Sequence, residues 1–392
     1  MRLIDTTTLE LHEFSEEQIP YGCFAVISHR WTNDEVTFKE YRRGLKKDSI
    51  GYRKILHSCE LAKIRNRQYV WIDTCCIDKR SSAELSEAIN SMFRWYQRSA
   101  ECYVHLQDVS LSSLLPGQEP HKLLAGSDWF TRGWTLQELL APTKALFFDS
   151  GWVAIGSRSD DDIASTISQI TGIQTYDLGQ FSQLRASVAR KMSWASKRKT
   201  TRPEDLAYSL LGLFDVNMPL LYGEGAAKAF MQLQLEIIRK SSDKSIFAWD
   251  WPRTTDEDAF SWPGLLAPSA EPFQDCGDIV VSEFNFENQF PYEMTNLGLS
   301  FKSKAEAVQG EGRAEKYIID LDCTRLRYQA GREGRLRERC YIMLEPSTLN
   351  NRVYRRRHFA HSEGVKPFEE RYPKGKRKDV GVKRFYIRQA GL

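Results

Sequence analysis

Apolar and polar positions alternate in two rhythms along the first 158 residues. Short apolar runs, each long enough for one buried strand, occupy 24–28, 69–73, 102–106 and 145–148. Between them, apolar side chains recur at helical spacing over 51–67 and 85–96, which predicts amphipathic helices. Strands that alternate with helices are typical of βαβ units, so we expect an α/β domain with a parallel sheet flanked by helices.

Two local signals mark where helices begin and end. Ser81 and Glu84 fit a capping box, in which the serine hydroxyl binds a free helix amide and the glutamate reaches back to the amide of Ser81. Pro142 ends a helix before the fourth apolar run. Residues 107–128 read as a long connection, and such loops at strand ends tend to carry function.

The pattern changes twice after residue 158. Helical spacing predicts helices over 163–170, 183–197 and 204–213, and a further helix that residues 223–225 open and that runs through Ile238. Beyond Trp249, short alternating runs predict strands at 279–281, 297–301, 317–321, 341–344 and 385–387. We therefore expect three parts: an α/β domain over 1–158, a helical extension packed on it over 159–250, and a small β-rich C-terminal domain over 251–392.

Composition excludes some classes of protein. A hydrophobic content of 41% with 12% aromatic residues is typical of globular chains, and no apolar run approaches the roughly 18–20 residues of a membrane span. The N-terminus shows neither a secretory signal nor a transit peptide, so we expect a cytoplasmic protein. The eight cysteines are scattered, which predicts reduced, mostly buried thiols.

The net charge of +3 does not by itself indicate a polyanionic partner. Positive charge gathers at 355–357 and 374–378, and a basic tail can attract nucleic acid or an acidic membrane surface. A solvated basic rim is the commoner role of such runs. We therefore do not expect nucleic acid as a partner.

Polar clusters follow three of the predicted strands. In open α/β sheets, ligands bind outside the carboxyl ends of the strands, so residues 28–31, 73–80 and 129–138 should converge on one edge. A carboxylate, guanidinium groups and indole faces suit a nucleotide, which offers ribose hydroxyls, phosphates and aromatic rings. The candidate site residues are Ser28, His29, Arg30, Trp31, Asp73, Cys75, Arg80, Arg132, Trp134 and Glu138.

Each candidate also has an ordinary structural explanation. Glu138 could simply favour the start of a helix, where an acid interacts well with the dipole. Indoles are more often core residues than ligand platforms, and a single histidine is more often a satisfied polar residue than a catalyst. Cys75 lies in no recognisable metal or nucleophile pattern. Asp73 and Asp78 could bind a divalent cation, but aspartates at turns are commoner, so we expect no metal site.

Three blocks resemble the signatures of the fungal heterokaryon-incompatibility (HET) domain. They are 24–31 (FAVISHRW), 71–79 (WIDTCCIDK) and 132–138 (RGWTLQE), in matching order and spacing. Residues 202–212 (RPEDLAYSLLG) and 221–225 (LYGEG) resemble the helical extension common in this family. Thr32 departs from the family pattern, which more often has glycine there, and this changes the flexibility of the loop slightly.

HET domains also look distantly related to Toll/interleukin-1 receptor (TIR) domains, whose sheet is flavodoxin-like. Residues 28–30 resemble a TIR strand end of Ser-Phe-Arg, and 134–139 resembles the TIR segment Trp-Cys-x-x-Glu-Leu. That glutamate is catalytic in NAD-cleaving TIR domains, so the resemblance implies Glu138 as the catalytic residue here. NAD would be the substrate, with no further cofactor.

The resemblance implies a cell-death effector in fungal non-self recognition that releases nicotinamide from NAD and leaves ADP-ribose or a cyclic form. The alternative is a non-enzymatic death-signalling module that acts by homotypic association and partner recruitment. Both readings imply self-association and a possible sensor or incompatibility partner.

Overall fold

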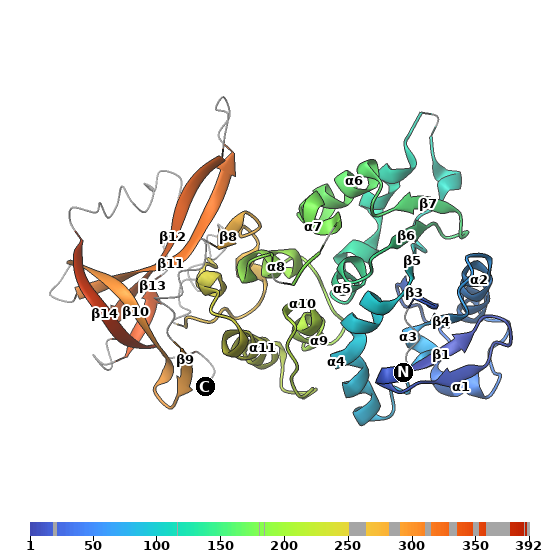
Figure 1. The fold of residues 1–392 in the computed structure, drawn as a ribbon, viewed down its shortest axis with the longest axis horizontal. Helices are drawn as coiled ribbons and strands as arrows, with labels where there is room; N and C mark the ends of the chain where they lie inside the picture. Colours follow the sequence, from blue (N-terminus) through green and yellow to red (C-terminus); the bar gives the residue numbers. More distant parts are fainter. Residues whose placement is uncertain are drawn as a thin grey trace. The chain divides into compact units, whose positions relative to one another are not determined.

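The computed structural model describes residues 1–18, 22–115, 117–179, 181–183, 185–250, 264–281, 291–309, 315–328, 335–347, 353–357, 377–387 and 389. The chain divides into two compact units (Figure 1). Unit 1 comprises Met1–Gln183 and Arg198–Tyr222, and unit 2 comprises Leu184–Lys197 and Gly223–Leu392.

Unit 1 is an α/β fold. Its strands are β1 (Arg2–Asp5), β2 (Leu11–Glu13), β3 (Phe24–His29), β4 (Tyr69–Trp71), β5 (Glu101–His105), β6 (Ala145–Phe148) and β7 (Ala154–Ser157). Its helices are α1 (Phe38–Arg42), α2 (Ile50–Ile64), α3 (Asp73–Cys76), α4 (Ser82–Arg98), α5 (Thr135–Leu140), α6 (Asp161–Thr171), α7 (Thr175–Gly179), α9 (Asp205–Tyr208) and α10 (Leu211–Phe214).

The sheet of unit 1 has the order β2-β1-β4-β3-β5-β6-β7. The four central strands, β4, β3, β5 and β6, are parallel, as the apolar runs predicted. The prediction of a parallel sheet is confirmed only for these four strands: the whole sheet is mixed, because β1, β2 and β7 pair antiparallel outside them. β1 and β2 form a hairpin, as do β6 and β7, and a hairpin requires no helical crossover.

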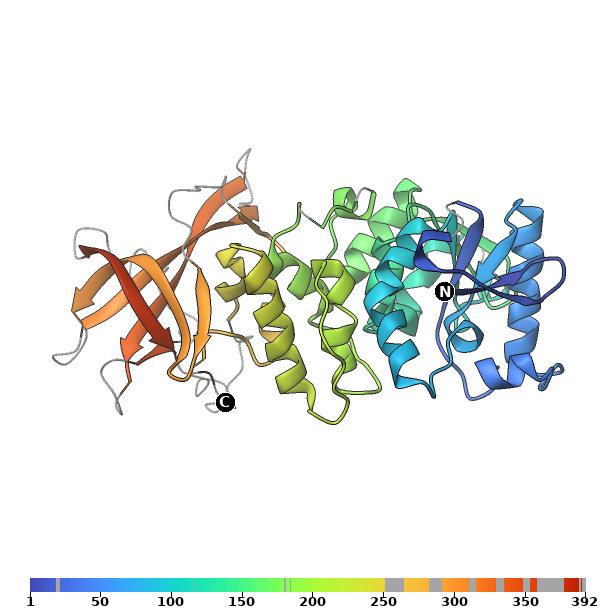
Figure 2. The ribbon, with the colours of Figure 1, turned by 60° about the horizontal axis from the view of Figure 1, so that its bottom comes forward.

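Helices cover both faces of this sheet. Figures 1 and 2 place α2 on one side of the central strands and α4 on the other. The chain runs from β3 through α2 to β4, crosses back through α4 to β5, and continues through α5 to β6. The order therefore reverses between β3 and β5, which is the topological switch point where doubly wound folds bind ligands.

The start of α4 confirms half of the predicted capping box. The Ser81 hydroxyl accepts the amide of Glu84 at 3.3 Å. The Glu84 carboxylate, however, accepts the amide of Asp78 at 2.7 Å and forms an ion pair with Arg2 on β1. The reciprocal bond to Ser81 was predicted wrongly because the Arg2 guanidinium and the amide of Asp78 draw the carboxylate away.

The helix predicted over 204–213 is broken into α9 and α10, and α10 ends at Asp215 with a φ of 54°. At Gly212, α10 approaches α4 so closely that a Cβ would overlap the side chain of Phe93. The long connection 107–128 contains the 3-10 turns η2 (Leu111–Ser113) and η3 (Pro120–Gly126), followed by η4 (Asp128–Thr131).

Unit 2 combines short helices with a curved sheet. Its elements are α8 (Val188–Ala195), α11 (Ala226–Lys240), η5 (Lys244–Phe247), η7 (Glu271–Phe273), β8 (Ile279–Val281), β9 (Tyr292–Thr295), β10 (Gly298–Gln309), β11 (Glu315–Tyr328), β12 (Arg335–Pro346), β13 (Tyr354–Arg357) and β14 (Lys378–Ile387). β10 pairs with both β14 and β11, so the strands from β10 to β14 close into a barrel-like ring. The β-rich C-terminal part is thus confirmed.

The helices of 159–250 are divided between the units: α6, α7, α9 and α10 belong to unit 1, and α8 and α11 to unit 2. The three-part division stays a prediction. All eight cysteines are free thiols, and six of them are buried. Among the helices that the structure describes, we find none with the length and apolarity needed to cross a membrane.

Candidate functional site

The end of β3 sends consecutive side chains to opposite faces of the sheet, as the pleat of a strand requires. Ser28 lies on the face covered by α5 and bonds with Glu138. His29 lies on the other face, near Glu35 and Lys54 of α2. Both side chains are buried, so the strand-end motif builds two distinct polar environments at the switch point.

Glu138 lies in the first turn of α5 and is buried, with 8% of its surface exposed. The Ser28 hydroxyl donates to its carboxylate, and the indole Nε1 of Trp129 donates to the Ser28 oxygen at 2.8 Å. The phenol of Tyr96 on α4 donates to the carbonyl oxygen of Ile27 at 3.2 Å and lies close enough to the carboxylate to lower its pKa. Three separate segments therefore converge on this carboxylate.

Burial raises the pKa of Glu138 to about 8, because the charged form loses its hydration. The bond from Ser28 acts in the opposite direction, and the negative charge of Asp73 raises the pKa further. Tyr96 and the positive charge of Arg198 lower it by smaller amounts. At neutral pH the carboxyl group is therefore mostly protonated. A strongly shifted pKa of this kind is common among residues of functional sites.

A second set of bonds fixes the turn that precedes Glu138. The Thr135 hydroxyl lies 2.6 Å from the carbonyl oxygen of Trp129 and 2.9 Å from that of Arg132. The Arg198 guanidinium donates to the Thr135 hydroxyl at 2.9 Å and to the Arg132 carbonyl at 2.8 Å. These contacts hold the first turn of α5 in place, so the position of Glu138 depends on a residue 60 positions later in the chain.

A more exposed cluster lies at the ends of β3 and β4. The indole Nε1 of Trp31 donates to the carboxylate of Asp73 at 3.0 Å, and the Lys79 ammonium binds the same carboxylate at 3.2 Å. That ammonium also lies 3.2 Å from the centre of the Trp31 ring. Arg30 points elsewhere and forms an exposed ion pair with Asp128.

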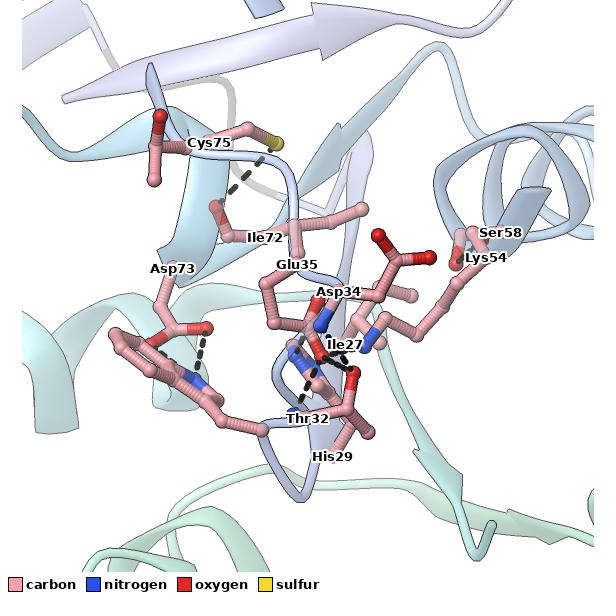
Figure 3. Close-up of polar contacts among 12 residues, drawn as sticks. Ile27, His29, Thr32, Asp34, Glu35, Lys54, Ser58, Ile72, Asp73 and Cys75 are labelled. Carbon is pink, nitrogen blue, oxygen red and sulfur yellow. Dashed lines mark hydrogen bonds and ion pairs between the residues drawn. The ribbon is translucent and has the colours of Figure 1, made fainter. Parts of the chain in front are cut away.

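On the α2 face, a buried ion pair supports the loop after β3 (Figure 3). Lys54 Nζ lies 2.6 Å from Glu35 Oε1, and that oxygen also accepts the amide of Thr32 at 3.0 Å. His29 Nε2 lies 3.7 Å from Glu35 Oε2. Neither ring nitrogen of His29 has a hydrogen-bond partner among the described residues, and burial holds its pKa well below the usual range, so the ring is neutral.

Besides Arg30, four predicted site residues lie apart from these clusters. The Cys75 thiol is buried against the carbonyl of Ile72, and burial raises its pKa well above that of a free thiol. Arg80 is exposed and pairs with Asp78 at 2.6 Å. The two remaining side chains reach later segments of unit 1: Arg132 bonds with Thr201 at 3.3 Å, and Trp134 with Asp205 at 3.3 Å.

The structure also adds residues that the sequence did not identify as part of the site. Tyr96 lies on the apolar face of a helix and has the spacing of a core residue. Arg198 stands in a basic run that is typical of a solvated surface, whereas Trp129 lies in the segment 129–138 that the sequence did place at the site. Only the buried carboxylate next to them could have revealed their role, because no local pattern distinguishes them.

The parts of the chain that the structure describes hold no group of three or more His, Cys, Asp or Glu residues placed to bind a metal ion. Instead, they offer a buried carboxyl group with a hydroxyl partner, and an exposed indole with a carboxylate beside it. Such an arrangement can stabilise positive charge in a ligand.

Unit 1 is a doubly wound α/β fold that carries polar motifs at the ends of its central strands, and these two features together indicate the class of protein. Residues 24–123 match the model of the family described as "Heterokaryon incompatibility protein (HET)", so this segment of the chain is a HET domain.

Over 218 residues the chain is 45% identical to "Vegetative incompatibility protein HET-E-1" of Podospora anserina. The match covers 55% of this chain and 16% of that protein, so the chain corresponds to a small part of its relative. No solved structure matches the chain significantly.

Proposed function

We propose that this HET domain is the effector of an incompatibility response and cleaves NAD to nicotinamide and ADP-ribose or a cyclic form. The observation that carries the proposal is the Glu138 carboxyl group, buried and held by Ser28 at the edge where doubly wound sheets bind ligands. The resemblance to NAD-cleaving TIR domains supports the same residue. The name of the Podospora relative supports the biological setting.

The proposed reaction needs one ionised carboxylate. The bond between the ribose C1′ and the nicotinamide nitrogen breaks, and its electron pair neutralises the positive charge of the ring. The Glu138 carboxylate stabilises the oxocarbenium-like ribose that forms, and water or the adenine of the same molecule then adds to C1′ and gives up a proton to solvent. Nicotinamide leaves as a neutral molecule, so no acid has to protonate it.

A cationic substrate would also favour the ionised form of Glu138, which is mostly protonated in the free protein at neutral pH. Since burial raises the pKa of this group to about 8, a neighbouring nicotinamide ring would favour its ionised form and release a proton. Substrate binding and activation of the carboxylate are thus one event in this proposal.

The test is release of free nicotinamide from NAD by the purified full chain, measured over a range of protein concentrations. We expect Glu138→Gln, which keeps the shape of the side chain, to lower the rate by at least about a hundredfold, the typical contribution of a major charge-stabilising group. Glu60→Gln is the matched control, because Glu60 is an exposed carboxylate on α2. Equal rates for wild type and Glu138→Gln would reject the catalytic assignment.

One observation favours a second function. With only 8% of its surface exposed, Glu138 resembles a structural residue that locks α5 against β3. A non-enzymatic signalling module that acts through homotypic association would use such a rigid unit. This alternative predicts that Glu138→Gln still kills a fungal host, whereas surface substitutions that block self-association do not.

A further inference from the structure

The cluster of Trp31, Asp73 and Lys79 has the composition of a cation-binding site, and a side chain of the protein itself occupies it. The Lys79 ammonium lies over the indole face, 3.2 Å from the ring centre, and 3.2 Å from the Asp73 carboxylate. An aromatic face combined with a carboxylate is a common means of binding organic cations. Lys79 fills the position that a ligand cation would take.

The three side chains are accessible enough for exchange. Trp31 is 47% exposed, and the Lys79 side chain is 31% exposed. Lys79 lies in the turn before α4, and its ammonium is compact and strongly hydrated, so it loses little when it returns to water. The indole is less free to move, because Asp73 holds its N–H.

The loop that carries Trp31 is anchored from the opposite side. Glu35, held by the buried ammonium of Lys54, accepts the amide of Thr32, the residue after Trp31 (Figure 3). The aromatic face is therefore held in place before any ligand arrives, which lowers the entropy lost on binding.

We propose that Trp31 and Asp73 form a binding site for a planar pyridinium cation, and that Lys79 is a built-in competitor that must be displaced from it. A flat ring is favoured over a compact ammonium because the indole offers a whole face for stacking. The choice of pyridinium rests on the proposed NAD cleavage, whereas the cation site and its competitor do not.

The location fits this proposal. The charge of Asp73 is felt by Glu138, so a cation that replaces Lys79 lies within electrostatic reach of the proposed catalytic carboxylate. Lys79 would then set the apparent affinity for the nicotinamide end of the substrate, and its displacement would be part of binding.

The probe for this site is 1-methylnicotinamide, which carries the cationic ring but has no glycosidic bond to cleave. We would titrate it into the full chain labelled at tryptophan nitrogens and follow the Trp31 indole N–H, assigned by its loss in Trp31→Phe. We expect Lys79→Gln to bind the probe roughly three- to tenfold more tightly than wild type, because the competitor is gone. Neutral nicotinamide should bind wild type and Lys79→Gln with the same affinity.

Equal affinities of wild type and Lys79→Gln for 1-methylnicotinamide would overturn the proposal. An equal increase in the affinity of Lys79→Gln for neutral nicotinamide would also overturn it. Unchanged affinity of Trp31→Leu for 1-methylnicotinamide would do the same. Tetramethylammonium supplies the charge without a ring, and binding as tight as that of the probe would refute the choice of a planar cation.

The same titration in Glu138→Gln separates the two proposals. Lys79→Gln is combined with Glu138→Gln for this purpose. If the double variant binds 1-methylnicotinamide more tightly than Glu138→Gln alone, while wild type releases no nicotinamide from NAD, the cation site stands and the enzymatic proposal falls. If nicotinamide is released but Lys79→Gln changes nothing, the reverse holds.

Discussion

Glu138 is the residue on which the proposed chemistry of this domain depends. A serine, a phenol and an indole, all from other elements, build a closed polar environment around one carboxyl group. The simplest structural explanation, that this acid merely favours the start of its own helix, does not account for its bond to Ser28, 110 positions earlier in the chain.

The raised pKa of Glu138 predicts how stability depends on pH. The folded protein holds this proton up to about pH 8, whereas an unfolded chain releases it near 4.5, so the folded state binds more protons between these values. Stability should therefore fall as pH rises through this window, by up to about 1.4 kcal/mol per unit, and then level off.

Chemical denaturation of wild type and Glu138→Gln from pH 5 to pH 9 checks this. Glutamine does not titrate, so the stability of the variant relative to wild type should increase steadily toward pH 8. Parallel stability curves would contradict the raised pKa.

At the scale of elements, the loop after β3 depends on the buried pair of Glu35 and Lys54. Both side chains are less than 10% exposed, and the pair holds the amide of Thr32. Removing one partner leaves an unpaired buried charge, which costs more than the pair itself contributes.

We expect Lys54→Met to lower the free energy of unfolding by about 3–5 kcal/mol. Lys63→Met, an exposed position on the same helix, should change it by less than about 0.5 kcal/mol. The double variant Lys54→Met with Glu35→Leu should recover much of the loss, because no charge remains buried. A loss in Lys54→Met no larger than that in Lys63→Met would show that the pair is not truly desolvated.

The contact between α4 and α10 is equally specific. At Gly212 a methyl group would overlap Phe93, so Gly212→Ala should destabilise unit 1 by about 1–3 kcal/mol through overpacking. Gly179→Ala is the control, since nothing lies within 4 Å of an added Cβ there. Equal melting temperatures for the two variants would contradict the close approach.

At the scale of the molecule, the compact unit that contains the α/β fold extends beyond residue 158, where the sequence predicted that the α/β domain ends. Arg198–Tyr222 belongs to unit 1, and it carries both Arg198, which fixes the turn before Glu138, and Gly212, which packs on α4. We therefore expect a fragment of residues 1–158 to melt at a lower temperature than the full chain and to lose protection of α4 in hydrogen exchange. A fragment as stable as the full chain would show that the later segment contributes nothing.

The central strands could be predicted because strands buried on both faces read as continuous apolar runs. The strand β1 could not, since its four residues, Arg2–Asp5, include two charged ones and form no apolar run. The three site loops could be predicted from the rule for strand ends. The roles of Tyr96 and Arg198 could not, because they come from a helix face and a basic run that look ordinary in sequence.

The most direct test of the central claim is the pH dependence of kcat/KM for nicotinamide release from NAD, measured for wild type and Glu138→Gln. If Glu138 acts as an ionised carboxylate, the wild-type value should rise about tenfold per pH unit up to about pH 8 and then level off, while the variant stays near background. Equal values for the two proteins across the whole range would contradict the claim that Glu138 cleaves NAD.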